Sequence, residues 1–318
     1  MNANNNSIQC HEVGEVETFG NILELIKKNL LSPRPKNPRI QVYVDMLVIE
    51  NNSLEDKIKF KSGSEELQVI VAKDLFCHKH YRKKNGASFS QYLDKKENAI
   101  MLNIWTDSDP NSEEVFGKMV NLLMGVVVAA EIQYKVYSFK NKQRMVKNFL
   151  RNWRCNSVEV SSREPQCDLQ VFQLLVESPK FSTLYLDIQN RCNRFVHYNY
   201  PLPAKDFFLK TGEWVVKENL KNMQCTRFEA QDVDLTAFEI NEFLENWRAG
   251  DCQNLKHLKM EFKDPMNFCE IIKDLELESA GKGSEKSWWL RRSDGLRMAK
   301  LEMDGNVFSM RVEEVERI

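Results

Sequence analysis

The chain has 318 residues, of which 42% are hydrophobic and 29% are charged, a composition that excludes wholesale disorder. Its 45 basic and 46 acidic residues nearly cancel, which argues against a nucleic-acid-binding protein, because such proteins gather a basic excess on one face. The longest apolar stretch, Leu122–Ala130, is far shorter than the roughly 20 residues that a membrane span requires.

The N-terminal end is polar and rich in asparagine, without the apolar core of a signal peptide. The eight cysteines occur without CxxC pairs, a pattern typical of reduced thiols that are buried in a protein core. Together these features favour a cytoplasmic or nuclear protein, and they do not separate the two locations.

The first 110 residues contain two patterns. Residues 1–38 are expected to form a flexible tail, a short helix over Phe19–Leu31, and a proline-rich linker over Ser32–Pro38 that stops the helix. Residues 39–110 change to alternating and β-branched runs with turn signals such as Ser62–Ser64, which predict an N-terminal antiparallel β region. The expected strands are Ile40–Ile49, Lys57–Phe60, Leu67–Val71 and Ala99–Trp105.

Residues 111–278 alternate helices with short strands, which favours an α/β fold with parallel strands joined by helices. The expected helices are Glu113–Met124, Lys142–Trp153, Asp168–Glu177, Glu213–Met223, Ala237–Trp247 and Asn267–Asp274. The expected strands are Ile132–Tyr137, Ser157–Val160, Thr183–Ile188, Arg227–Ala230 and Leu255–Phe262.

Residues 279–318 carry two short hairpin signals, Ser293-Asp294-Gly295 and Asp304-Gly305-Asn306. They predict a C-terminal β meander of three strands. The expected strands are Trp288–Arg292, Leu296–Met303 and Val307–Val312.

Two helices of the α/β region end almost identically, since Phe149–Arg154 matches Phe243–Arg248 at five of six positions. Each has one apolar stripe, and we expect Trp153 and Trp247 to lie in the core. The strand centres Val158, Leu184, Phe228 and Leu258 are separated by 26, 44 and 30 residues, and the long gap would hold an insertion around Cys192–Pro203. Periods of this length predict a leucine-rich-repeat-like strand–helix solenoid.

The second of these helices has a clear start and end. Thr236 and Glu239 fit a capping box, Leu235 is placed to pack against Ile240, and Gly250 follows the last turn, where a left-handed residue is favoured. We therefore expect this helix to be sharply bounded.

No known catalytic or phosphate-binding motif occurs in the sequence. The densest group of possible metal ligands is Cys77-His78-Lys79-His80, but no second ligand pair follows at zinc-site spacing. We therefore expect no enzyme activity, no cofactor and no metal. An enzyme or metal site around Cys77–His80 is the less favoured alternative.

One region resembles a known family. Leu209–Phe262 contains Trp214, the stretch Leu235–Gly250 and the strand Asn254–Met260, and it is similar to the nematode F-box-associated domain. The resemblance implies the target-binding part of a substrate receptor in a Skp–cullin–F-box ubiquitin ligase. Such a receptor has no active site of its own and binds a protein target.

The sequence departs from that family at its N-terminal end. No F-box opening with a Leu-Pro motif is evident, and Pro33, Pro35 and Pro38 follow the helix Phe19–Leu31 at once. We therefore favour a non-catalytic protein–protein interaction module whose protein target is unknown. The alternative is a complete receptor with a degenerate F-box that also binds a Skp-type adaptor.

Strand alternation indicates which side chains would contact a partner. If the apolar residues of each strand face the helices, including Ile132, Tyr134 and Val136, the intervening residues share one open face. The alternative interpretation is that these are only the polar sides of half-buried strands. The predicted partner-binding residues are Gln133, Lys135, Tyr137, Glu159, Tyr185, Asp187, Arg227, Glu229, His257, Lys259 and Glu261.

Overall fold

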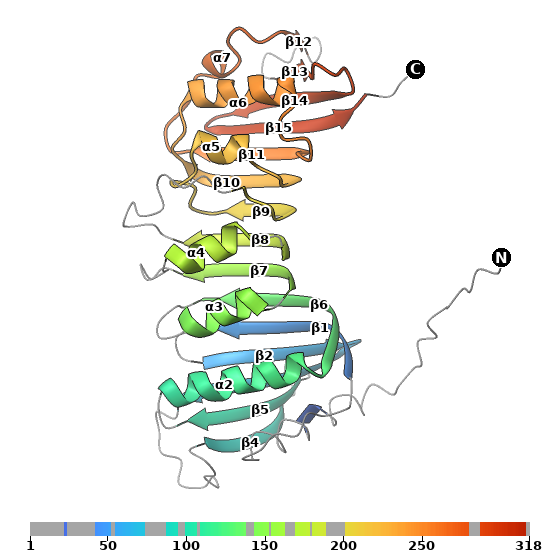
Figure 1. The fold of residues 1–318 in the computed structure, drawn as a ribbon, viewed down its shortest axis with the longest axis vertical. Coiled ribbons are helices and arrows are strands. Elements are labelled where there is room, and N and C mark those ends of the chain that lie inside the picture. The colour runs from blue at the N-terminus through green and yellow to red at the C-terminus, as the bar shows by residue number, and fades with distance from the viewer. Residues whose placement is uncertain are drawn as a thin grey trace, which may run out of the picture. The chain divides into compact units, whose positions relative to one another are not determined.

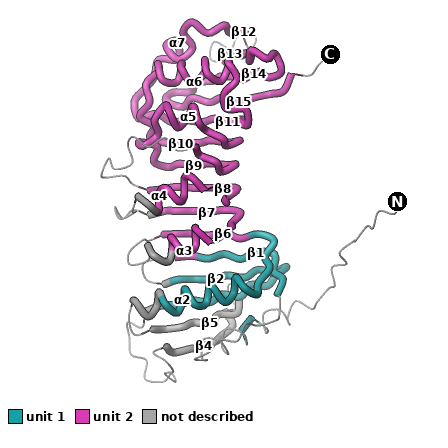
Figure 2. Tube along the Cα trace, in the orientation of Figure 1, with its two compact units in different colours: residues 1–49, 54–131 teal, residues 50–53, 132–318 magenta. Residues whose placement is uncertain are grey.

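A computed structural model of the chain describes residues 22–23, 42–51, 55–73, 87–94, 99–106, 109–137, 143–152, 154–162, 169–178, 180–188, 201–279 and 287–315 (Figure 1). The chain divides into two compact units, which Figure 2 colours separately. Unit 1 comprises residues 1–49 and 54–131, and unit 2 comprises residues 50–53 and 132–318. The two units are described one at a time.

Unit 1 contains a mixed sheet with the strand order β1-β2-β3-β5-β4, accompanied by helix α2 (Asp109–Met124). Its strands are β1 (Val42–Asn51, which ends in unit 2), β2 (Glu55–Ser62), β3 (Glu65–Lys73), β4 (Ala87–Asp94) and β5 (Ala99–Thr106). The predicted β2–β3 hairpin is confirmed: the strands are antiparallel, and Gly63 takes the positive φ of 56° that their tight turn needs. Phe116, Met119 and Leu123 of α2 are buried, as are Leu67 and Val69 of β3.

The expectation of an antiparallel N-terminal region holds only in part, because β3 pairs with β5 in parallel. Strand β4, which sequence analysis did not identify, explains the difference. It pairs with β5 in an antiparallel ladder on the side away from β3. Two reversals of direction between β3 and β5 therefore bring β5 back parallel to β3.

The strands of unit 2 follow one another in the order β12-β13-β14-β15-β11-β10-β9-β8-β7-β6. Its strands are β6 (Val127–Val136, in this unit from Ile132), β7 (Cys155–Ser162), β8 (Phe181–Ile188), β9 (Asp206–Leu209), β10 (Arg227–Val233), β11 (His257–Phe262), β12 (Leu277–Ser279), β13 (Ser287–Arg291), β14 (Arg297–Asp304) and β15 (Val307–Glu314). Strands β6 to β11 are parallel, as predicted, so the described chain is α/β with open, mixed β structure.

The helices of unit 2 pack on one side of these parallel strands (Figure 1). They are α3 (Gln143–Asn152), α4 (Leu169–Val176), α5 (Lys217–Lys221), α6 (Ala237–Ala249) and α7 (Phe268–Ile271). The ring of Tyr134 on β6 lies 3.9 Å from that of Phe149 on α3, measured between centroids. The apolar residues of neighbouring strands pair in register and are all buried on this side: Tyr134, Val158, Leu184, Phe207, Phe228 and Leu258.

Strand β9 corrects the predicted insertion between β8 and β10. Phe207 pairs with Leu184 on one side and Phe228 on the other, so the 44-residue gap divides into steps of 23 and 21 residues. The Phe207 and Phe228 rings lie 6.0 Å apart between centroids and are stacked. Of the segment Cys192–Pro203, only Pro201–Pro203 lies within the described residues.

The predicted C-terminal meander is confirmed. Strands β13, β14 and β15 form two antiparallel hairpins, and their turns contain Gly295 and Gly305 with positive φ. Strand β15 then pairs antiparallel with β11, which joins the meander to the parallel strands. The short strand β12, absent from the sequence prediction, pairs with β13.

Helix α6 has the predicted capping box. The backbone N–H of Thr236 donates to Glu239 Oε2 over 2.8 Å, and that of Glu239 donates to Thr236 Oγ1 over 3.3 Å. Gly250 ends the helix with φ 129°, and Trp247 is fully buried, both as expected.

Helix α5 is shorter than the predicted Glu213–Met223, because its first residues form a turn instead. The backbone N–H of Gly212 donates to the carbonyl oxygen of Gln231 over 2.6 Å, and a Cβ at Gly212 would lie 2.8 Å from that oxygen. This close contact carries the neighbouring Trp214 and Val215 into the core.

Several expectations fall outside the described residues: Trp153, Cys77–His80 and most of Phe19–Leu31, of which only Ile22 and Leu23 are described. Within the described part of the chain, no helix is both long enough and apolar enough to cross a membrane.

Candidate functional site

The side of the unit 2 sheet that points away from the helices is the candidate site, and we call it the open face. Strand residues alternate between the two sides, so the residues between the buried apolar ones lie on the open face. The structure places all eleven predicted residues there, half-buried or exposed. Tyr134 and Val136 are buried as expected, whereas Ile132 is only partly buried.

The strand register arranges these residues in rows across the sheet. The first row comprises Gln133, Ser157, Thr183, Asp206, Arg227, His257 and Arg311. The middle row comprises Lys135, Glu159, Tyr185, Phe208, Glu229, Lys259, Ser309 and Glu302. Neighbours within a row are about 4.8 Å apart, close enough for their side chains to interact.

Two aromatic side chains lie at the centre of the open face. Tyr185 on β8 and Phe208 on β9 are opposite each other in the ladder, and both are half-buried. The guanidinium carbon of Arg227 lies 5.2 Å from the centroid of the Phe208 ring, in cation–π geometry. We call Tyr185 and Phe208 the aromatic pair.

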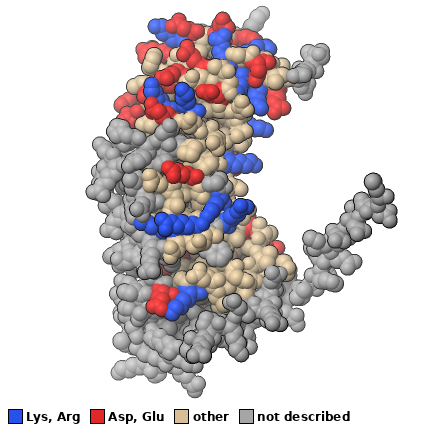
Figure 3. Space-filling model, in the orientation of Figure 1, with Lys and Arg blue, Asp and Glu red and all other residues tan. Residues whose placement is uncertain are grey.

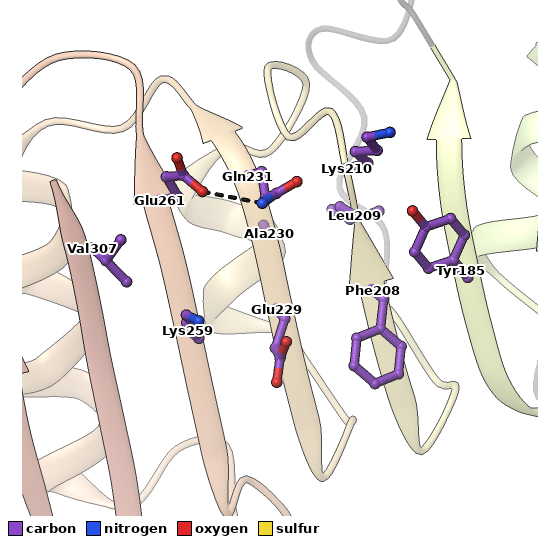
Figure 4. A pocket seen from close by; sticks show the side chains of 10 residues that line it. All are labelled: Tyr185, Phe208, Leu209, Lys210, Glu229, Ala230, Gln231, Lys259, Glu261 and Val307. Atoms are coloured by element: carbon purple, nitrogen blue, oxygen red, sulfur yellow. Dashed lines mark hydrogen bonds between the residues drawn. The ribbon is translucent and has the colours of Figure 1, made fainter. Parts of the chain in front are cut away.

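The aromatic pair separates two hollows in the open face. One, of about 470 Å³, lies over β6 to β9 and includes Gln133, Lys135 and Glu159 in its lining. The other, of about 250 Å³, is shown in Figure 4. It is lined by Tyr185, Phe208, Leu209, Lys210, Glu229, Ala230, Gln231, Lys259, Glu261 and Val307. Apolar surface is therefore exposed at the middle of an otherwise polar face.

Most charged groups of the open face are paired with one another. Lys135 Nζ lies 3.2 Å from Glu159 Oε2, and Lys210 Nζ lies 3.3 Å from Asp187 Oδ2. In the hollow of Figure 4, Gln231 Nε2 donates to Glu261 Oε2 over 3.1 Å. These pairs hold the side chains in place and leave little net charge around the aromatic pair.

Glu229 lies at the centre of a small charged cluster. Arg227 Nε donates to Glu229 Oε1 over 2.7 Å, and His257 Nε2 lies 3.2 Å from the same oxygen. The pKa of His257 is lowered mainly because partial burial disfavours the charged imidazole. The positive charges of Arg227 and Arg311 lower the pKa further, whereas the negative charge of Glu229 raises it. His257 is therefore neutral near pH 7.

Two groups on β6 and just after it also have shifted pKa values. Partial burial, followed by the charge of Glu159, raises the pKa of Tyr137. Burial opposes the charge on Lys135, but the hydrogen bond and charge of Glu159 outweigh it and raise the pKa of Lys135. Both groups keep their ordinary protonation states near neutral pH.

A third hollow, of about 470 Å³, lies over β11, β15 and β14, and we call it the β11–β14 hollow. It is lined by His257, Lys259, Ser287, Glu302, Met303, Asp304, Val307, Ser309 and Arg311. Sequence analysis placed only His257 and Lys259 of this set on the open face, because it treated the meander separately from the repeat.

Sequence analysis also missed Phe208, because β9 was not predicted as a strand. The alternation of Phe207 and Leu209, spaced between Leu184 and Phe228, was the signal that could have revealed it. Among the described residues, no group of three or more histidine, cysteine or acidic side chains is placed to hold a metal ion.

The fold and this site define a class of α/β protein. Helices cover one side of its parallel strands, and the other side presents paired charges around an aromatic centre. Comparison with known proteins is more specific. A family model described as F-box associated matches residues 200–260, which run from just before β9 into β11. The chain thus resembles the F-box-associated domain family over this segment.

A curated relative is similar over a longer segment. E3 ubiquitin-protein ligase hecw-1 from Caenorhabditis elegans is 22% identical over 153 residues, which is 47% of this chain. The match covers only 12% of the ligase. No solved structure is significantly similar to the chain.

Proposed function

We propose that the chain is a non-catalytic protein-interaction module that binds a protein target on its open face. The observation that carries this proposal is the aromatic pair, which lies half-buried between two hollows with paired charges around it. Protein interfaces draw most of their binding energy from a few central, well-packed aromatic and arginine side chains inside a polar rim. Tyr185, Phe208 and Arg227 fit that arrangement.

The repeat supplies a reason for the open face to exist. We infer that β6 to β11 with their helices form a leucine-rich-repeat-like solenoid, in which each unit covers one side of its strand with a helix. The spacing of the buried residues that pair in register supports this inference. From Val158 to Leu258, successive members are separated by 26, 23, 21 and 30 residues. In such repeats the uncovered strand side is available to a partner.

We further propose that target binding serves ubiquitin transfer by other proteins. The resemblance to the F-box-associated family and the similarity to an E3 ubiquitin-protein ligase support this role. A receptor of this kind contributes proximity, by holding the target near the catalytic subunits, and needs no active site of its own.

The partner would be a protein rather than a nucleic acid. Figure 3, which views the side of unit 2 that carries its helices, shows Lys and Arg interspersed with Asp and Glu around α6. On the open face, Lys135 and Lys210 are paired with acidic side chains. A polyanion is bound by a basic surface, which the near-zero net charge does not favour. The cytoplasm or the nucleus fits a role in ubiquitin ligation.

The main alternative is a complete Skp–cullin–F-box receptor with a degenerate F-box. A pull-down of purified Skp adaptor by the full chain distinguishes the two proposals. Robust binding that depends on residues 19–31 would support the alternative, whereas we expect no adaptor binding.

The open face is tested with a matched pair of variants. Tyr185→Ala combined with Phe208→Ala removes the aromatic pair, and Phe238→Ala removes an aromatic side chain that is 72% exposed on α6, away from the open face. Proteins captured from native tissue by the wild-type chain are compared quantitatively across the variants, and the affinity of the main partner is then measured by calorimetry. We expect the double variant to weaken binding at least tenfold and Phe238→Ala to leave it unchanged; equal affinities for all three chains would refute the proposal.

A further inference from the structure

Two cations in the β11–β14 hollow differ from the other cations of the open face. Lys135, Lys210, Arg227 and Lys300 each have a carboxylate partner within hydrogen-bond or ion-pair distance. Lys259 and Arg311 are exposed, and neither forms an ion pair within the described part of the chain. We propose that Lys259 and Arg311 bind the carboxylate of an Asp or Glu side chain on the protein target, an inference that rests on the proposed function.

The strand register brings the two cations to the same hollow. Lys259 is opposite Ser309, and His257 is opposite Arg311, in the antiparallel ladder of β11 and β15. All four side chains lie on the open face and line the β11–β14 hollow, whose volume is about 470 Å³. Lys259 and Arg311 therefore flank the hydroxyl of Ser309 from two directions, an arrangement that offers an anion three donors.

The acidic residues of the hollow do not cancel this positive charge. Glu302 is already paired, since Lys300 Nζ lies 2.6 Å from its Oε1. Asp304 is opposite Val307 in the ladder of β14 and β15. It lies two residues beyond Glu302, at the end of the hollow away from Arg311. The charge of Arg311 also reaches its neighbour, because it helps to lower the pKa of His257. Electrostatic complementarity at this end therefore favours an acidic group.

The proposed carboxylate site adjoins the aromatic pair, which favours a protein segment over a free anion. Lys259 and Val307 line both the hollow of Figure 4 and the β11–β14 hollow, so the two are contiguous. Within the middle row, Lys259 lies two strand spacings from Phe208, and Ser309 lies three. These separations correspond to about 10–14 Å. An extended peptide covers that distance in about three or four residues. The expected motif is an apolar residue with Asp or Glu three or four positions away.

Peptide selection on the full chain tests the inference. A phage-displayed random peptide library is selected against wild-type protein and against Lys259→Glu combined with Arg311→Glu. We expect the wild-type chain to enrich the apolar-to-acidic motif and the charge-reversed chain to replace the acidic position with Lys or Arg. A synthetic wild-type-selected peptide should lose at least tenfold in affinity when its Asp or Glu becomes Asn or Gln, measured by fluorescence anisotropy.

A matched control reverses two exposed cations at helix ends, away from the open face. Lys221→Glu combined with Lys273→Glu changes the net charge by the same amount as the charge-reversed chain and should leave the affinity of the acidic peptide unchanged. Exposed substitutions of this kind usually leave stability almost unchanged. If the charge-reversed chain nevertheless melts at a lower temperature than wild type, Lys259→Gln with Arg311→Gln replaces it.

The outcomes separate this inference from the proposed function. Peptides that need Tyr185 and Phe208 but bind the charge-reversed chain equally well would overturn the carboxylate site and leave the proposed function standing. Peptides unaffected by either set of substitutions would overturn both. Enrichment of the acidic motif together with its reversal on the charge-reversed chain would establish the site.

Discussion

Helices α3 and α6 share almost the same final residues, but different side chains complete their C-terminal ends. In α3, the carbonyl oxygen of Arg151 accepts a hydrogen bond from Lys180, which precedes β8. In α6, the carbonyl oxygen of Gly250 accepts one from Arg292, which comes from the turn between β13 and β14. Arg292 is only 4% exposed, and its guanidinium carbon lies 5.6 Å from the centroid of the Trp247 ring.

Two helices with the same apolar residues can therefore have different cations at their C-terminal ends. A cation near a helix C-terminus interacts favourably with the helix dipole in both cases. The Lys180 contact joins adjacent parts of the repeat, whereas Arg292 links the meander to α6 across 42 residues of sequence. The buried link has a cost, because Arg292 Nη1 and Trp247 Nε1 find no hydrogen-bond partner among the residues that the structure describes. Asp294 Oδ2 is 3.5 Å from Arg292 Nε, which partly offsets the charge.

The largest expected effect tests the stripe that both helices share. Trp247→Ala and Phe149→Ala each remove a buried ring and should lower the free energy of unfolding by roughly 3–5 kcal/mol. Urea unfolding followed by circular dichroism measures the loss. An unchanged unfolding midpoint for either variant would refute the assignment of that ring to the core.

The second prediction compares the contributions of Arg292 and Lys180 to stability. Arg292→Ala removes a buried contact with Trp247 and leaves the Gly250 carbonyl oxygen without its donor, so we expect a loss of about 1–3 kcal/mol. Lys180→Ala removes a more accessible contact and should cost less than about 1 kcal/mol. Thermal unfolding of both variants gives the comparison, and equal losses would contradict it.

Arg292→Met sharpens the same comparison. Methionine keeps apolar contact with the Trp247 ring and removes the unpaired donors, so its cost should be smaller than that of Arg292→Ala. A larger cost would mean that the charge of Arg292 itself stabilises the helix end.

The third prediction concerns the start of α6. Thr236→Ala removes the oxygen that accepts from the Glu239 backbone N–H and should lower stability by about 1 kcal/mol. Thr236→Ser retains the oxygen and serves as the control. Hydrogen exchange of the first turn of α6 should speed up only in the alanine variant; equal exchange rates in both variants would argue against the cap.

The smallest expected effect is on the pH dependence of stability, and it concerns the strands that follow α3 and α6. Strand β7 begins with Cys155, whose thiol has a pKa raised to about 12 by burial, so it does not titrate near neutral pH. Strand β11 begins with His257, whose pKa is lowered in the folded state from the ordinary value of 6.5. As pH falls below about 6.5, the unfolded chain binds this proton more readily, so stability decreases until the folded-state pKa is passed.

His257→Gln should reduce the dependence of unfolding free energy on pH between about 5 and 7. Cys155→Ala is the control, since it should shift stability by the same amount at every pH in that window. An identical pH dependence in wild type and His257→Gln would contradict the lowered pKa.

Much of the open face was predictable because strand alternation is a local property. Once Leu258 and Met260 are assigned to the core, His257 and Lys259 must point the other way. The partners of these residues were not predictable in the same way. The contact of Glu229 with His257 depends on the register between two strands separated by a helix, which no local pattern determines.

Two of the errors in the predicted fold have local causes. Strand β9 is only four residues long, and Phe208 adds an apolar residue to its open face, so the alternation of Phe207 and Leu209 is short and weak. The start of α5 looked helical because Trp214 and Val215 are apolar, but the close backbone contact at Gly212 forces a turn there. Both errors arise where tertiary packing outweighs local preference.

The alternation within β7 to β11 has a consequence for how such a chain can diversify. Stability depends on one set of strand residues, such as Val158 and Phe228, and the composition of the open face depends on the interleaved set, such as Glu159 and Glu229. Substitutions in the exposed set usually change stability by less than about 0.5 kcal/mol. If the open face binds a target as proposed, gene duplicates of this chain can acquire new targets by changing alternate residues of short strands, while each copy keeps the same core and folds as before.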